Sequence, residues 1–340
     1  MKKTSTLEER IKQASLAPMW KRPKMLAKPQ SKCSEQLWSY KEIKNLLLEA
    51  SPLITPEDSE RRVLILESKD LPESFFLSPT LFAGVQLLLP GEVAAAHRHS
   101  QAAIRFVFEG EGAYASVGGE KVSLEKGDLL INPRNEWHDH GHEGKIPALW
   151  LDVLDVPLVD VVDAQFREWS NQAKQEINFT DGHSNLLFSN GLRATTGELF
   201  KSRESTHQEY IRKYSYINSR RTLNELMSSK KLDPYKGAEL VYVDPRGGSV
   251  LPTIDAFLQG IPAKFSTLSY QSTETKIVVV AEGEVQIVLD DKTYILKEND
   301  IFLIPSWRKY SMTGVTDAVL FSASNKPLLV STGLWYEVKA

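Results

Sequence analysis

The chain has 340 residues, of which 41% are hydrophobic and 25% charged, a balance typical of a soluble globular protein with room for two domains. A net charge of −3 excludes the basic excess typical of nucleic-acid binding, and no uncharged apolar run of about 18 residues predicts a membrane span. The single cysteine, Cys33, cannot form an internal disulfide, and the charged N-terminus lacks the apolar core of a signal peptide. We therefore expect a cytoplasmic protein.

Residues 1–50 are predicted to form a helical N-terminal segment. Leu7, Ile11 and Ala14 recur at helical spacing, and residues 38–50 (WSYKEIKNLLLEA) show the same period. Three prolines between these stretches predict an extended connection.

Residues 51–160 are predicted to form a first β-barrel. Short apolar or β-branched runs cut by turn residues are typical of an antiparallel sandwich or barrel. Gly118-Gly119 predicts a tight hairpin turn between two of these strands. The runs are VLIL, LFAGVQLLL, IRFVFEG, GAYASVGGEKVSL, GDLLINP and ALWLDVLDV.

Residues 161–235 interrupt the strand pattern and are predicted to be a helical linker, with helices at 162–171 and 222–230. From 236 to 340 the strand pattern returns and predicts a second barrel. Its runs are LPTIDAFLQG, KIVVVAEGEVQIVL, KTYILKENDIFLIP and AVLFSAS.

The two strand-rich regions repeat each other. The matched segments are 104–117 with 277–289, and 127–133 with 299–305, which place Glu109 on Glu282 and Asp128 on Asp300. Two correspondences in one register indicate an internal duplication. The predicted fold class is therefore all-β dominated, with two similar barrels in tandem.

Three histidines of the first barrel form a candidate metal site. His97 and His99 stand two residues apart, so on a strand both point to the same side while Arg98 points away. His138 follows a turn and a further strand, and a hairpin-rich barrel can bring it beside them. Three imidazoles on one face would leave about three open positions on an octahedral metal.

At these residues the sequence resembles the cupin superfamily, whose first motif is G-x5-H-x-H-x(3,4)-E-x6-G and whose second is G-x5-P-x-G-x2-H-x3-N. The matching residues are Gly91, His97, His99, Gly110, Gly127, Pro133 and His138. The chain departs from the motifs at the glutamate, which falls on Ala103, and at the last asparagine, which falls on His142. Without the carboxylate all ligands are neutral, so the metal keeps its full positive charge toward an anionic, chelating substrate.

Two more histidines follow closely. His140 lies two residues past His138 and would also point inward, as a ligand or, as we favour, as an acid–base group. His142 is predicted to be a surface loop residue. The repeat register places Tyr270, Ser272 and Tyr310 on the three histidine positions of the second barrel. We therefore expect the second barrel to be structural and without metal.

Over nearly its whole length the chain resembles the gentisate 1,2-dioxygenase family, which also contains salicylate and 1-hydroxy-2-naphthoate dioxygenases. The similar segments include APMW (17–20), LWSYKEIKNLLLEA (37–50), ERRVLIL (60–66), FAGVQLLLPGE (82–92) and LPTIDAFLQ (251–259). The resemblance implies one Fe(II) per subunit in the first cupin, extradiol-type cleavage of gentisate with O2 to maleylpyruvate, and a homotetramer.

A pocket for an aromatic acid also needs cations and acid–base groups. Arg105, in the apolar strand IRFVF, is predicted to bind a carboxylate and to act in catalysis. Arg61 resembles the family's other active-site arginine, although the neighbouring Arg62 leaves the register open. Gln86 would offer an amide to the substrate, and Asp152 would orient the His140 proton.

Three alternatives stay open at this point. The same chemistry could act on salicylate, 1-hydroxy-2-naphthoate or a related hydroxybenzoate. A cupin of another kind could bind a small acid without catalysis. A metal-dependent sugar-phosphate isomerase would be expected to carry a glutamate ligand where Ala103 stands.

Overall fold

The computed structural model describes residues 6–54, 61–179, 181–188, 210–229, 231–245 and 247–339. The residues up to Gln30 form a unit of their own, with helix α1 (Leu7–Gln13) and a 3-10 turn η1 (Met19–Lys21). Thr6 and Glu9 close a capping box at the start of α1, which confirms the predicted first helix. No helix within the described ranges combines the length and apolarity that crossing a bilayer requires.

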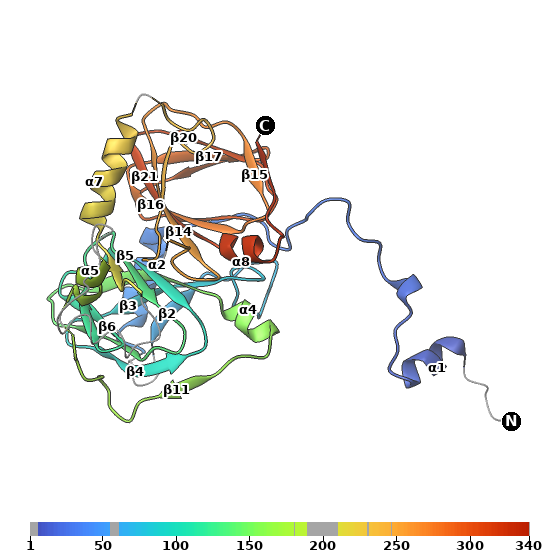
Figure 1. Cartoon of the computed structure of the whole chain (residues 1–340), viewed down its shortest axis with the longest axis horizontal. Coiled ribbons are helices and arrows are strands. Elements are labelled where there is room, and N and C mark those ends of the chain that lie inside the picture. Colours follow the sequence, from blue (N-terminus) through green and yellow to red (C-terminus); the bar gives the residue numbers. More distant parts are fainter. Residues whose placement is uncertain are drawn as a thin grey trace. The chain divides into compact units, whose positions relative to one another are not determined.

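The unit that begins at Ser31 holds two β-barrels, the first drawn in cyan to green and the second in orange to red in Figure 1. In the first barrel a six-stranded sheet, β12-β8-β5-β10-β3-β2, faces a five-stranded sheet, β11-β4-β9-β6-β7. The strands are β2 (Arg62–Ile65), β3 (Phe82–Leu88), β4 (Val93–His99), β5 (Ala103–Glu109), β6 (Ala113–Val117), β7 (Glu120–Ser123), β8 (Leu129–Asn132), β9 (His138–His142), β10 (Ala148–Leu154), β11 (Arg167–Trp169) and β12 (Lys213–Tyr214).

The second barrel repeats this arrangement with the sheet orders β1-β19-β16-β21-β14-β13 and β22-β15-β20-β17-β18. Its strands are β1 (Gln36–Trp38), β13 (Ala238–Val241), β14 (Asp255–Ile261), β15 (Tyr270–Ser272), β16 (Lys276–Glu282), β17 (Val285–Leu289), β18 (Lys292–Leu296), β19 (Ile301–Ile304), β20 (Tyr310–Gly314), β21 (Ala318–Ser324) and β22 (Glu337–Lys339). The remaining helices are α2 (Tyr40–Ala50), α4 (Val156–Val161), α5 (His183–Phe188), α7 (Tyr216–Met227) and α8 (Lys326–Ser331). The predicted all-β fold with two barrels is confirmed.

Strand register confirms the predicted duplication. His97 pairs with His138 across β4 and β9, and Tyr270 pairs with Tyr310 across β15 and β20. The second barrel therefore carries tyrosines at the positions of two histidines of the first.

The repeat is longer than the sequence indicated, because each copy begins with a strand that joins the other barrel. β1, at the head of the first copy, pairs with β19 of the second barrel. β12, at the head of the second copy, pairs with β8 of the first barrel. Helices α2 and α7 follow these strands directly, so the copies exchange their first strands.

Two tyrosines hold this exchange in place and explain the matched acidic residues. Tyr40 donates its backbone N–H to Asp300 (3.1 Å) and its hydroxyl to Glu109 (2.7 Å). Tyr216 makes the mirror pair, with its N–H on Asp128 (2.8 Å) and its hydroxyl on Glu282 (2.6 Å). Each helix start therefore bridges both barrels through hydrogen bonds to carboxylates.

The prediction of a helix at 162–171 is wrong. A short helix, α4, ends at Val161, and β11 follows, paired along β4 so that Arg167 lies opposite His99 and Trp169 opposite His97. This segment takes its conformation from the free edge of β4, a tertiary partner that local periodicity does not report. The helix predicted at 222–230 forms as Tyr216–Met227, and Lys230 lies outside the described residues.

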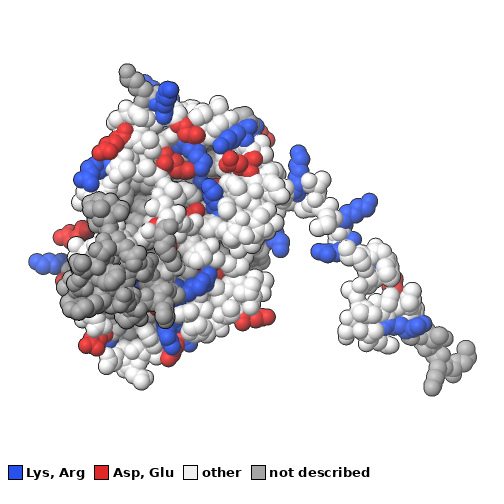
Figure 2. All heavy atoms as spheres, in the orientation of Figure 1, with Lys and Arg blue, Asp and Glu red and all other residues white. Residues whose placement is uncertain are grey.

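Surface charge agrees with the balanced composition. On the face shown in Figure 2, basic and acidic side chains are interspersed. A net charge of −3 is thus spread rather than concentrated on this face.

Candidate metal centre and aromatic-acid pocket

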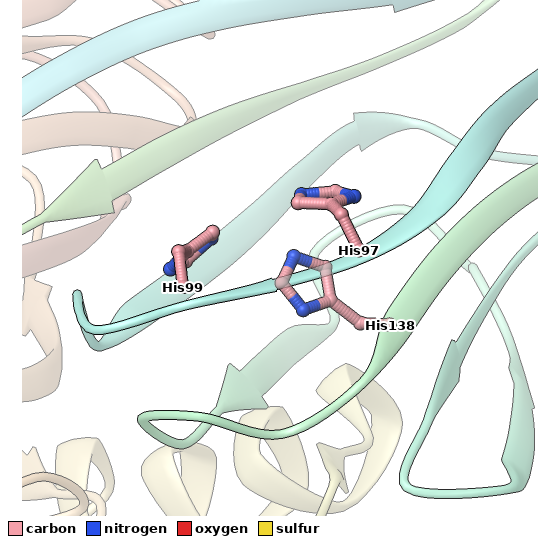
Figure 3. Close-up of side chains that lie close together, drawn as sticks. All are labelled: His97, His99 and His138. Atoms are coloured by element: carbon pink, nitrogen blue, oxygen red, sulfur yellow. The ribbon is translucent and has the colours of Figure 1, made fainter. Parts of the chain in front are cut away.

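The three predicted histidines converge inside the first barrel. Figure 3 shows His97 and His99 on β4 facing His138, which starts β9. Their ring centroids lie 4.2 to 5.6 Å apart, and one nitrogen of each ring lies within 4.8 Å of the others. Among the described residues, this is the group of His, Cys, Asp or Glu side chains that could hold a metal ion.

Backbone carbonyls fix the tautomer of each ring. Every Nδ1 of the three lies 2.7 to 3.0 Å from a carbonyl oxygen two residues away in the chain. Since a carbonyl oxygen can only accept, each Nδ1 carries the proton and each Nε2 keeps its lone pair. All three rings are thus prepared to ligate through Nε2.

Burial keeps these rings neutral. It lowers the pKa of His97 to about 2 and that of His99 to about 3, with the positive charge of Arg61 as the next cause. The pKa of His138 falls well below its ordinary value, again mainly through burial. Neutral imidazoles are the protonation state that binds metal, so no proton has to leave at pH 7.

The donor set fits a divalent transition metal. Three neutral imidazole nitrogens suit Fe, Zn, Cu or Ni. The Nε2 of His138 is buried and has no hydrogen-bond partner in the described part of the chain. A metal ion supplies the partner that this lone pair lacks.

Arg61, rather than Arg62, faces this centre. Its guanidinium contacts Nε2 of His97 and lines the adjoining cavity. Arg62 instead forms a buried ion pair with Glu92. The different contacts of the two arginines thus resolve the register that the sequence left open.

Arg105 and Asp152 form a buried ion pair beside the histidines. Their side chains are 1% and 4% exposed, and Nε lies 2.7 Å from Oδ1. Trp150 donates its indole N–H to the other carboxylate oxygen (3.2 Å). Burial lowers the pKa of Arg105, and the Asp152 charge opposes that shift. Nη1 of Arg105 has no acceptor among the described residues, so the guanidinium retains capacity for an anion.

The predicted contact between Asp152 and His140 is not formed. The carboxylate pairs with Arg105, and neither ring nitrogen of His140 has a partner among the described residues. Burial lowers the pKa of His140 well below its ordinary value, so the ring is neutral. The Oε1 atom of Gln86 is also buried without a partner in that part of the chain. These unsatisfied atoms are typical of a site that awaits a polar ligand.

A cavity of about 520 Å³ opens next to His99, a size suited to a small aromatic acid. Half of its lining residues are apolar, and the other half are polar or charged. The lining residues are Arg61, Val63, Ile65, Phe82, His99, Gln101, Asp152, Leu154, Val156, Gln165, Phe166 and Arg167.

Sequence reasoning missed the part of this lining that β11 and the residue before it contribute. Phe166 and Arg167 line the cavity, and the Trp169 ring lies 5.0 Å from the His97 ring. The signal in the sequence was weak, because Arg167-Glu168-Trp169 lacks the apolar–polar alternation of a half-buried strand.

The prediction that His142 is a surface loop residue is wrong. It is 3% exposed and ends β9. Its Nε2 donates to the carbonyl of Ile146, and its Nδ1 accepts the N–H of Gly144 at 3.1 Å. Both nitrogens are therefore used to fix the 142–146 turn, and neither is free to ligate.

His142→Ala is accordingly expected to leave metal binding close to the wild-type level. The variant should unfold at a lower temperature, because it loses two hydrogen bonds worth about 0.5–1.5 kcal/mol each. Metal titration and thermal unfolding of the purified variant test both statements. Loss of the metal at unchanged stability would contradict this assignment.

The second barrel has a different interior at the equivalent position. Tyr270 and Tyr310 replace two histidines there, with ring centroids 5.8 Å apart. Lys276 stands in the register position of Ala103 and lies 3.4 Å from Glu274, both side chains being buried. An internal ion pair therefore stands near the position that the metal centre takes in the first barrel.

Comparisons with known proteins agree with this geometry. The family model "Cupin domain" matches residues 84–154, which include the three histidines. The chain is 37% identical to gentisate 1,2 dioxygenase 1 of Aquipseudomonas alcaligenes over 331 residues, covering 96% of this chain and 94% of that one. It is 31% identical to 5-aminosalicylate 1,2-dioxygenase of Comamonas sp. over 339 residues, covering 97% and 89%.

Solved structures show the same fold. The structure of salicylate 1,2-dioxygenase from Pseudoaminobacter salicylatoxidans with gentisate superposes with a TM-score of 0.89 at 28% identity, covering 100% of this chain and 96% of that chain. The similarity therefore spans both barrels as well as the metal motif. The chain belongs to the gentisate 1,2-dioxygenase family of two-cupin, ring-cleaving dioxygenases.

Proposed function

We propose that this enzyme holds one Fe(II) per subunit on His97, His99 and His138 and cleaves gentisate with O2 to maleylpyruvate. The observation that carries the proposal is the convergence of three neutral Nε2 donors beside a cavity of about 520 Å³. Gentisate takes up both atoms of O2, so no external reductant is needed. When bound, the iron supplies a Lewis acid and a path for electrons between the aromatic ring and oxygen.

The protein's own contribution begins with binding. Arg105 lies buried beside the centre with an unused N–H, which suits the carboxylate of an aromatic acid. Gln86 offers its amide from β3, which pairs with β10 in the same sheet. The apolar walls, among them Phe82 and Phe166, contact the ring and keep water away from it.

Arg61 is proposed to move when the metal binds. Its guanidinium now contacts Nε2 of His97, the atom that would ligate. For His97 to hold a cation there, the guanidinium would have to leave this atom, and the cavity that Arg61 already lines offers it room. There it would become a second cation for the substrate.

His140 is proposed to handle the proton. Its ring is neutral, buried and without a hydrogen-bond partner in the described chain, and it lies 6.0 Å from His138 between ring centroids. Burial and the nearby arginine charges lower its pKa, so it would accept a proton from a substrate hydroxyl only when an anionic substrate offsets those charges. Asp152 would act through Arg105, which it holds in place.

Oxygen uptake tests the proposal. The chain is loaded anaerobically with Fe(II) and mixed with gentisate, salicylate and 1-hydroxy-2-naphthoate in turn, while oxygen and product absorbance are followed. We expect one O2 consumed per gentisate, no uptake by the Zn(II)-loaded chain because zinc has no redox chemistry, and recovery after Fe(II) is restored. Faster oxygen uptake with another acid would assign that acid as the substrate. No uptake with any of the three acids would support a binding protein instead.

The wider setting is also proposed. We infer a cytoplasmic homotetramer with a helical N-terminal segment (1–50), a metal-binding cupin (51–160), a linker (161–235) and a cupin without metal ligands (236–340). The linker is helical only in part, because it carries β11 and β12 of the first barrel as well as α5 and α7. The family resemblance supports the tetramer, and light scattering of the purified chain tests it. The linker includes residues 189–209, which lie outside the described ranges.

A further inference from the structure

One peptide unit separates a metal ligand from a buried carboxylate. The carbonyl oxygen of Gln101 lies 3.0 Å from Nδ1 of His99. The N–H of the same peptide unit, which belongs to Ala102, donates to Oδ1 of Asp155 at 3.0 Å. His99, the peptide and Asp155 thus form a continuous line of hydrogen bonds that ends at the Nε2 lone pair.

Asp155 is held from two sides. It is 1% exposed, and it forms an ion pair with Arg134. Thr253, from the second copy of the repeat, donates its hydroxyl to the same carboxylate. Arg134 also donates to the carbonyl of Ser100 (2.8 Å), so the turn after His99 is fixed at two successive positions.

The second barrel contains the same bonds in neutral form. The N–H of Thr275 donates to Oδ1 of Asn325 at 2.9 Å, as Ala102 does to Asp155. The amide of Asn325 donates to Thr80 of the first copy at 2.9 Å, which mirrors the contact of Thr253.

The arginine contact has a neutral counterpart as well. Ser306 donates its hydroxyl to the carbonyl of Thr273 at 2.8 Å, as Arg134 does to Ser100. The carboxylate and the guanidinium therefore occur in the barrel that has the histidines, and an amide and a hydroxyl replace them in the barrel that lacks histidines.

We propose that Asp155 is a positioning residue that orients His99 and strengthens it as a ligand through the Gln101–Ala102 peptide. A negative charge at the N–H end of an amide increases the electron density on its carbonyl oxygen. That oxygen becomes a better acceptor for Nδ1–H, and the opposite nitrogen of the ring becomes more basic. Thr253 couples the second barrel to this line. The inference rests on the metal-dependent function proposed above.

The experiment compares matched variants of the two barrels. Asp155→Asn converts the carboxylate into the amide that the second barrel carries, and an amide oxygen can still accept from Ala102. Thr253→Val and Thr80→Val remove mirror-image contacts between the barrels, one beside the histidines and one not. Fe(II) affinity is measured anaerobically by competition with a chromogenic chelator, and the thermal unfolding of each metal-free variant is recorded.

We expect Asp155→Asn to weaken Fe(II) binding on the order of 10-fold, as the loss of partners behind metal ligands does. Thr253→Val should weaken Fe(II) binding less than Asp155→Asn does. Thr80→Val should leave Fe(II) binding unchanged, although its unfolding temperature should fall about as much as that of Thr253→Val. With Co(II) in place of iron, the visible absorption bands of Asp155→Asn should be shifted from those of the wild type. The bands of Thr80→Val should match the wild type.

Wild-type affinity in both Asp155→Asn and Thr253→Val would overturn the proposal, as would equal weakening in Thr253→Val and Thr80→Val. If Asp155→Asn does not fold, the two threonine variants decide alone. Failure of the reaction is distinguishable, because it would appear as a wild-type chain that binds Fe(II) but consumes no oxygen.

Discussion

Replacing His99 with alanine is expected to remove both iron and turnover. His99 supplies one of three converging lone pairs, and the two remaining imidazoles leave the metal exposed to water and chelators. Losses of 10- to 100-fold follow from disturbing the partners behind a ligand, so the loss of a ligand itself should exceed about 100-fold in metal affinity. Iron content after gel filtration and oxygen uptake with gentisate measure the two effects.

The metal-free His99→Ala variant should still fold. The wild-type ring is buried and neutral without metal, and its replacement leaves a cavity beside the existing pocket rather than an unpaired charge. His142→Ala is the matched control, since that ring lies on β9, as His138 does, but has both nitrogens bonded to the backbone. Equal loss of iron in both variants would show that the ligand set has been wrongly assigned.

The residues that the sequence predicted best are those whose direction a strand alone determines. A histidine two residues from another on a strand must point to the same side, so His97 and His99 could be placed from spacing alone. The repeat register likewise predicted that Tyr270 and Tyr310 occupy the positions of two histidines in the second barrel, and the strand pairing confirms it. Local geometry was sufficient in these cases.

The contacts that could not be predicted are those between distant segments. Nothing near Asp155 in the sequence indicates that its carboxylate meets Thr253, which lies in the other copy of the repeat. The exchange of β1 and β12 has the same character, since each strand is at most three residues long and exists only through its partner.

The pairing of side chains within the pocket was also beyond the sequence. Arg105 and Asp152 were both placed at the site, but their mutual ion pair depends on the register of β5 against β10. Asp152 was instead assigned to His140, which lies on a different sheet. The alternation of side chains along a strand predicts which side of the sheet each one faces. It does not predict which side chain of another strand it contacts.

Arg105→Val is expected to lower both stability and turnover, and the second barrel suggests how to separate the two effects. The change leaves Asp152 buried without its cation, which typically costs 3–5 kcal/mol. In the second barrel the equivalent pair is Val278 and Ser322, facing each other in the same register. The double variant Arg105→Val/Asp152→Ser should therefore regain most of the lost stability, because neither charge remains.

Turnover should not return with stability. If Arg105 binds the carboxylate of the substrate, both the single and the double variant should lose about 10²–10³-fold in kcat/KM with gentisate, the scale for losing one placed donor. Fe(II) content should stay near one per chain in both, because Arg105 is not among the converging nitrogen donors. Urea unfolding of the metal-free proteins and kcat/KM of the iron-loaded proteins measure the two effects separately. A double variant that recovered activity together with stability would mean that the arginine serves the fold and that another cation binds the acid.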